Sequence, residues 1–206
     1  MIELNLLTVI YLFLRLSPFI IVCFFALNSL FNQDFRGIVY LHGVIFACFI
    51  STMIYTAIGT STFFSSGEKK NPICTLVSFS KEPSSNVLPI GQNILGFSFF
   101  YLFYVIAKNS TYLTNLVVVI FFPILIICDF IWNMTNGCYD PRQLLLSLLM
   151  GSGFGMLLSY IIDSSGITSL QYFYSNNSKE QCSVPSKQTF KCNVYKNGAL
   201  IASTTQ

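Results

Sequence analysis

Five long stretches of apolar residues dominate the chain, and a polar connection separates each from the next. A helix needs about 20 apolar residues to cross a hydrocarbon core about 30 Å thick. The pattern therefore predicts an all-α membrane protein, a polytopic bundle of about five transmembrane helices. The predicted spans lie near residues 4–30, 37–58, 88–107, 113–134 and 144–162.

The connections divide the chain into two predicted domains. Residues 1–162 form a transmembrane domain, whose longest connection is the Ser-, Pro- and Lys-containing loop 59–87, and residues 163–206 form a soluble C-terminal tail. Arg15 and Pro18 lie inside the first span, so we expect that helix to tilt or kink. The span lacks a positively charged leader region and a small-residue cleavage site, so we expect it to be retained.

The tail contrasts with the apolar body. Asn197-Gly198 lies between short alternating runs, which predicts a type I′ turn and a small C-terminal β-hairpin. Nine residues separate Cys182 from Cys192, enough to close a loop. A disulfide between these two cysteines and a pair of free thiols are both compatible with the sequence.

Composition narrows the function classes. Charged residues make up 9% of the chain and hydrophobic residues 53%, and the net charge of +3 forms no basic stripe. We therefore expect no direct contact with nucleic acid. The sole histidine, His42, is far from the tail cysteines and no Cys-x-x-Cys occurs, so we predict neither a metal site nor a cofactor.

Small residues recur at every fourth position of the fifth span, where they predict a flat helix face that another backbone can approach. These helix-packing residues are Ser147, Gly151, Gly155 and Ser159.

Two ionisable residues lie deep in predicted spans, Arg15 in the first and Asp129 in the fourth. Because an unpaired charge in a membrane is costly, we expect an intramembrane pair between them. The pair is either structural or part of a polar path, and the second reading makes the protein a transporter or channel. Gln92 and Asn93 early in the third span, with Asn133 and Asn136 late in the fourth, predict an interhelical hydrogen-bond cluster.

Two enzyme templates fail on the sequence. Pro83-Ser-Ser-Asn86 and Arg142 resemble parts of membrane phosphatases of the phosphatidic acid phosphatase type, but the histidines that this family needs are missing. No Gly-x-Ser-x-Gly elbow supports a serine hydrolase. We therefore predict no enzyme and no catalytic residues, and we keep a degenerate phosphatase-like protein that binds lipid near Lys69, Lys70 and Arg142 as an alternative.

Two features of the sequence give conflicting predictions for the side of the membrane on which the tail lies. An odd number of spans places the two termini on opposite sides, and the distribution of Lys and Arg favours a cytoplasmic tail. The sequons Asn109-Ser-Thr and Asn176-Asn-Ser would be glycosylated only on a lumenal side. The sequence leaves the choice open.

A group of motifs between Pro83 and Ile201 carries a family resemblance. The tail supplies Cys182-Ser-Val-Pro185 with Cys192 and Asn197-Gly198, and the body supplies Pro89-Ile-Gly-Gln92, Asp129, Asn136-Gly-Cys138 and the glycine-rich fifth span. Together they resemble a family of small multi-spanning membrane proteins encoded by large double-stranded DNA viruses of algae and protists.

The resemblance implies a structural virion protein of the minor capsid type. Such a protein would lie in the internal viral membrane beneath the capsid, with the lipid bilayer and capsid proteins of the same virion as its partners. The tail would dock by adding its strands to a β-rich capsid protein. The side chains expected to contact that partner are Lys187, Phe190, Lys191, Tyr195 and Lys196.

Overall fold

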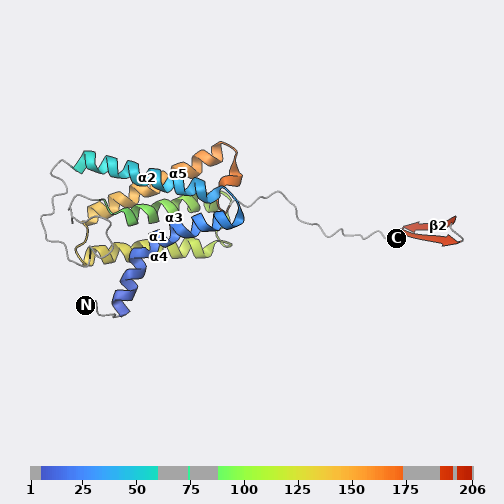
Figure 1. Cartoon of the computed structure of the whole chain (residues 1–206), viewed down its shortest axis with the longest axis horizontal. Coiled ribbons are helices and arrows are strands. Elements are labelled where there is room, and N and C mark those ends of the chain that lie inside the picture. The colour runs from blue at the N-terminus through green and yellow to red at the C-terminus, as the bar shows by residue number, and fades with distance from the viewer. Residues whose placement is uncertain (1–5, 60–73, 75–87, 174–190, 197–198, 206) are drawn as a thin grey trace. The chain divides into compact units, whose positions relative to one another are not determined.

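The structure is a computed structural model that describes residues 6–59, 74, 88–173, 191–196 and 199–205. Its first unit is a bundle of five helices (Figure 1). These are α1 (Leu6–Asn32), α2 (Arg36–Gly59), α3 (Ile90–Lys108), α4 (Leu116–Thr135) and α5 (Pro141–Ser164), followed by the short 3₁₀ helix η3 (Thr168–Leu170).

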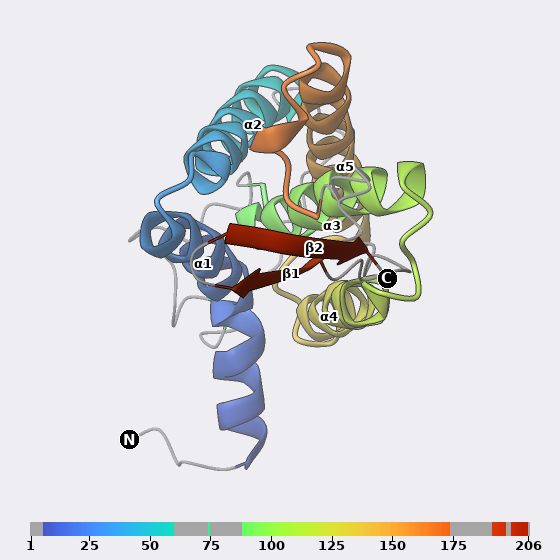
Figure 2. The same ribbon diagram turned by 90° about the vertical axis from the view of Figure 1, so that its right-hand side faces the viewer.

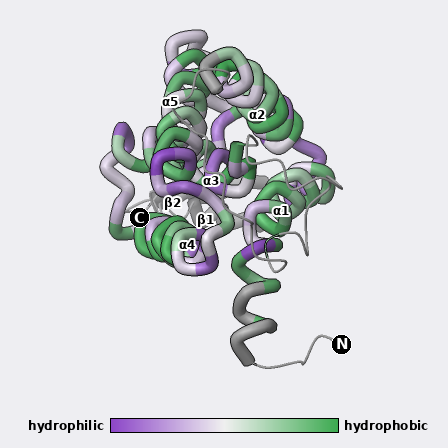
Figure 3. The backbone as a smooth tube through the Cα atoms, turned by 90° about the vertical axis from the view of Figure 1, so that its left-hand side faces the viewer, coloured by the Kyte–Doolittle hydropathy of each residue, from purple (hydrophilic) through white to green (hydrophobic). Residues whose placement is uncertain are grey.

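All five helices are long and apolar enough to cross a membrane. Hydrophobic residues predominate along their tubes, and hydrophilic residues gather near helix ends (Figure 3). Thirty-three large hydrophobic side chains in the described part are exposed, as expected for a bundle whose surroundings are lipid. The structure therefore confirms the coarse prediction, a helical bundle in which five helices of the described part are long and apolar enough to cross a membrane.

Helix ends follow local chemistry that hydropathy does not register. Helix α5 begins three residues before the predicted span, because Asp140 caps it and Pro141 occupies the first helical position. The Asp140 carboxylate accepts a bond from Arg142 N, and Gln143 Oε1 accepts one from Asp140 N. Helix α1 contains Pro18, and its first turns stand out from the other four helices (Figure 2).

Helix α3 occupies the centre of the bundle and contacts each of the other four helices (Figure 2). Of its span, 56% is buried inside the protein, against 22–28% for the other four. One of its faces packs on α5 at a constant offset of 58 residues. The four pairs along this seam are Ser147 with Pro89, Gly151 with Asn93, Gly155 with Phe97, and Ser159 with Tyr101.

A constant offset means that α3 and α5 run parallel, with every fourth residue of one meeting every fourth residue of the other. At the two ends of the seam, serine hydroxyls donate to α3 carbonyls, Ser147 to Pro89 at 2.7 Å and Ser159 to Tyr101 at 2.6 Å. In the middle, a Cβ on Gly151 would lie 2.1 Å from the Asn93 carbonyl oxygen. The structure thus places all four predicted packing residues against α3, where the backbones nearly touch.

The segment after α5 is also part of the bundle. Gln171 Nε2 donates to Ser159 O (2.7 Å) and Tyr172 Oη donates to Phe25 O (2.8 Å), and both side chains are buried. The compact unit extends to Tyr174, whereas the sequence placed the start of the tail at residue 163. Two polar side chains that pair with buried carbonyls account for the difference.

The second unit, residues 175–206, contains two antiparallel strands, β1 (Lys191–Lys196) and β2 (Ala199–Thr205), with an irregularity between Val194 and Tyr195. The turn residues Asn197-Gly198 lie outside the described residues, so the type I′ turn stays a prediction.

Candidate functional site

A polar cluster lies inside the bundle, near the end where α3 begins and α4 finishes. Gln92 Nε2 donates to Asp129 Oδ2 at 2.8 Å and to Ile126 O at 3.2 Å, and Asn133 Nδ2 donates to Asp129 O at 2.7 Å. All three side chains are buried, with Gln92 wholly inaccessible. Gln92 makes the predicted interhelical contact between the early part of α3 and the late part of α4. The Asn133 bond and the Asn136 Nδ2 bond to Trp132 O (2.9 Å) stay within α4.

Part of this cluster has unused hydrogen-bonding capacity. Gln92 Oε1 and both amide atoms of Asn93 are buried and have no hydrogen-bond partner among the described residues. A buried amide without a partner costs about 1–3 kcal/mol, so a small polar guest, such as a water molecule, would be stabilised here. The cluster thus combines an ionisable carboxyl group with acceptors and donors that no described residue satisfies.

Arg15 lies near this end of the bundle and is half-buried. Its guanidinium carbon is 6.0 Å from the centroid of the Tyr139 ring, a cation–π distance, and its charge acts on the Asp129 carboxylate. The ion pairs within 4.0 Å in the described part of the chain are Arg36–Asp34 and Lys108–Asp163. A direct Arg15–Asp129 bond therefore stays a prediction, and the structure adds Tyr139 as a partner of the arginine.

Two further links close the same end of the bundle. Gln143 Nε2, in the first turn of α5, donates to Tyr55 Oη near the end of α2 at 2.8 Å. Cys74, in the 60–87 connection, forms a disulfide with Cys138 in the α4–α5 turn, with 5.4 Å between their Cα atoms. Cys23, Cys48 and Cys128 are free thiols in the described part, as small apolar residues of the spans would be.

The sequence analysis did not predict the Cys74–Cys138 disulfide. A signal was available, since both cysteines lie in connections on the same side of the predicted bundle, but their separation of 64 residues hid it. The predicted Cys182–Cys192 disulfide stays untested, because Cys182 lies outside the described residues.

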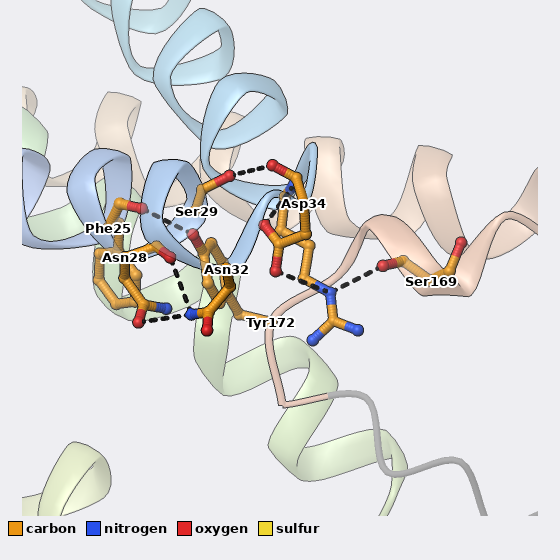
Figure 4. A network of polar contacts seen from close by, with 8 residues as sticks. Phe25, Asn28, Ser29, Asn32, Asp34, Ser169 and Tyr172 are labelled. Atoms are coloured by element: carbon orange, nitrogen blue, oxygen red, sulfur yellow. Dashed lines mark hydrogen bonds and ion pairs between the residues drawn. The ribbon is translucent and has the colours of Figure 1, made fainter.

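The opposite end of the bundle carries a second polar network, drawn in Figure 4. Arg36 Nε donates to Ser169 O at 2.9 Å and lies 3.8 Å from Asp34 Oδ2, while Ser29 Oγ donates to Asp34 O. These contacts join the α1–α2 turn to the segment after α5. Burial raises the pKa of Tyr172 in this network, and the nearby Asp34 carboxylate raises it further.

Other predicted residues are placed as follows. Lys187 and Phe190 lie outside the described residues, and Lys191, Tyr195 and Lys196 belong to β1. For the phosphatase-like alternative, Arg142 is exposed at the start of α5, while Lys69 and Lys70 are outside the described residues. His42 is exposed on α2, and its Nδ1 lies 3.0 Å from Ile38 O.

Comparison with known proteins adds no relative: no family model, no curated protein and no solved structure matches this chain. Within the described residues, no group of three or more His, Cys, Asp or Glu side chains comes together as a metal site would require. The site is therefore characterised by its own geometry. It is a buried carboxyl–amide cluster at one end of the bundle, and polar contacts join the helices at both ends.

Proposed function

We propose that this protein is a structural membrane anchor, in which a rigid helical bundle fixes a hydrophilic tail at one membrane face. The observation that carries the proposal is the α3–α5 seam. Backbone approaches backbone at Gly151 and Gly155, and serine bonds fasten both ends of the seam. Two helices packed in this way cannot separate without losing contacts over the whole width of the membrane.

Contacts that join the helices at both ends of the bundle support the same proposal. The disulfide and the Gln143–Tyr55 bond join connections and helices at one end, and Arg36, Gln171 and Tyr172 join the α1–α2 turn and the segment after α5 at the other. The last described residues before the tail are thus tied to the bundle. A force on the tail is transmitted to five membrane-spanning helices rather than to one.

The narrower proposal is a virion role, in which the tail ties an internal viral membrane to the capsid. The resemblance of the tail and the C-terminal half of the bundle to membrane proteins of large DNA viruses supports it. A two-stranded sheet of β1 and β2 would offer a strand edge on each side for strand addition to a partner. Lysines of the tail add electrostatic attraction to an acidic partner surface.

Fractionation of purified virions tests the virion role. After detergent strips the lipid, we expect the wild-type chain to remain with the capsid, with cross-links from Lys187, Lys191 or Lys196 to a capsid protein. A chain truncated after Tyr174 keeps the whole bundle and serves as the matched control, and we expect detergent to release it. Complete release of the wild-type chain would reject the virion role while leaving the general anchor proposal in place.

A transporter or channel is the second candidate, and the polar cluster favours it. Gln92 Oε1 and the Asn93 amide are buried, have no hydrogen-bond partner in the part of the chain that the structure describes, and lie beside a carboxyl group, an arrangement found on proton and ion paths. Ion or proton flux into proteoliposomes, abolished by Asp129→Asn, would establish this function. Equal flux through wild-type and empty vesicles would leave the cluster a structural one.

A further inference from the structure

The disulfide identifies one membrane face chemically. Cys74 belongs to the connection between α2 and α3, and Cys138 to the turn between α4 and α5. We call this side of the bundle the disulfide face. The opposite side, the tail face, carries the α1–α2 turn, the α3–α4 connection and the end of α5, from which the chain continues into the tail.

Contacts at the two ends support this assignment of faces. The Gln143–Tyr55 bond joins the start of α5 to the end of α2 at the disulfide face. The Lys108–Asp163 pair joins the end of α3 to the end of α5 at the tail face. In both cases, the two helix ends that chain order assigns to one face are in contact.

We propose that the disulfide face lies in an oxidising, non-cytosolic compartment, and that the tail face, with the C-terminal tail, lies in the cytosol. Disulfides form and persist in secretory compartments and outside the cell, whereas cytosolic thiols are kept reduced. A bridge that joins two connections can form only where both sulfurs meet an oxidising environment. The compartment of Cys74 and Cys138 then fixes the orientation of every helix.

This orientation decides three properties of the tail. Cys182 and Cys192 would meet a reducing solution, so we expect free thiols there rather than the bridge considered from sequence. The sequon at Asn176 faces away from the glycosylation machinery and stays unmodified. The partner of the tail is a protein or lipid headgroup that is accessible from the cytosol without crossing a membrane. The inference does not depend on the proposed anchor function, because a transporter would have the same orientation.

Counting thiols tests the disulfide part. The chain is expressed in eukaryotic cells, quenched in acid, denatured and labelled with a maleimide mass tag before and after reduction. We expect five tags before reduction, on all cysteines except the bridged pair, and seven after it. Seven tags before reduction would mean that no bridge forms, and would overturn the proposal.

Two double variants identify the bridged pair. With Cys74→Ser and Cys138→Ser together, we expect five tags both before and after reduction. Three tags before reduction would show that Cys182 and Cys192 are bridged, and would overturn the proposal. With Cys182→Ser and Cys192→Ser together, we expect three tags before reduction and five after. Because labelling is done on denatured protein, the count does not depend on how stable each variant is.

Protease protection tests the orientation separately. Sealed microsomes expose their cytosolic face, so protease added outside should remove a C-terminal epitope from the wild-type chain and leave a protected fragment of the bundle. An epitope that survives in sealed vesicles and disappears only after detergent is added would place the tail in the lumen and overturn the proposal. Glycosylation of Asn176, detected as an endoglycosidase-sensitive mass shift, would overturn it as well.

Discussion

Helices α3 and α4 belong to the same bundle, but the less apolar of the two, α3, is the more deeply buried. The α4 span has a mean hydropathy of 2.5 and is 28% buried, whereas the α3 span has a mean hydropathy of 1.5 and is 56% buried. In water the more apolar helix would occupy the centre. In a membrane, lipid tails solvate Leu and Ile as well as a protein interior does, so apolarity gives α4 no reason to be enclosed.

Helix α3 is buried because its backbone packs closely against α5 and its polar side chains pair with α4. Its Asn93 and Phe97 backbones meet glycines of α5, and Gln92 pairs with Asp129 of α4. Both interactions depend on residues that lower the hydropathy of a span. The contrast between α3 and α4 indicates that burial in this protein follows small and polar residues, and it can be tested by substitution.

The largest expected effect is at the seam. In Gly151→Ala, the new Cβ would lie 2.1 Å from a backbone oxygen that cannot rotate away, so we expect a loss of about 3 kcal/mol of unfolding free energy. Gly153→Ala is the matched control on the same helix, because no atom lies within 4 Å of its Cβ position. The midpoint of unfolding in mixed detergent micelles measures both. Equal midpoints would show that the seam is not a tight contact.

Neighbouring residues on α4 test the role of burial directly. Leu125 is 5% exposed and Ile124 is 53% exposed. We expect Leu125→Ala to cost about 2 kcal/mol through lost packing, and Ile124→Ala less than about 0.5 kcal/mol, because lipid replaces the deleted atoms. The same detergent unfolding assay applies. A larger loss at Ile124 would mean that this face of α4 contacts protein rather than lipid.

A double-mutant cycle measures the polar pairing between α3 and α4. Gln92→Leu removes a donor from the Asp129 carboxyl group, and Asp129→Leu leaves the Gln92 amide with only the Ile126 carbonyl to donate to, so each should cost about 2 kcal/mol. We expect the double variant to recover about 1 kcal/mol of the sum, the coupling energy of the bond. Cys128→Leu on the exposed side of α4 is the control and should change little. Strictly additive losses would contradict a direct interaction.

The smallest expected effect lies outside the spans, at Tyr172. The Tyr172→Phe change removes the bond to Phe25 O and should cost about 1 kcal/mol near neutral pH. Because burial raises the pKa of Tyr172 above its usual value of about 10, the neutral phenol is favoured in the folded state. The contribution of the neutral Tyr172 phenol to the free energy of unfolding is complete below about pH 10, and it is lost as the pH rises through the folded-state pKa.

The difference in unfolding midpoint between wild type and Tyr172→Phe should therefore shrink on titration above about pH 10. The comparison cancels the titration of the other tyrosines. A difference that stays constant to high pH would indicate that the hydroxyl is not buried in its neutral form.

Much of the fold was predictable because it depends on local composition. The five spans follow from run length, and the α5 seam from a four-residue period of small side chains. The pairing of Gln92 with α4 followed from the antiparallel order of consecutive spans. Each of these properties depends on the residues of one segment, or of two segments that are consecutive in the sequence.

The contacts that were missed join segments far apart in the sequence. The Cys74–Cys138 bridge spans 64 residues, the Gln143–Tyr55 bond 88 and the Tyr172–Phe25 bond 147. Each depends on which helix ends meet around the bundle, and hydropathy does not encode the order of helices around an axis. For the same reason the sequence could not identify Tyr139 as a neighbour of Arg15.

The sequence by itself determined that this chain forms five helices long and apolar enough to cross a membrane, and which helix face is flat, because those properties depend on residue type and spacing. Only the tertiary structure decided which helix is central, which polar atoms are paired or left open, and which cysteines are joined. Those outcomes depend on the geometry of packing in lipid, where apolarity alone does not sort helices into inside and outside.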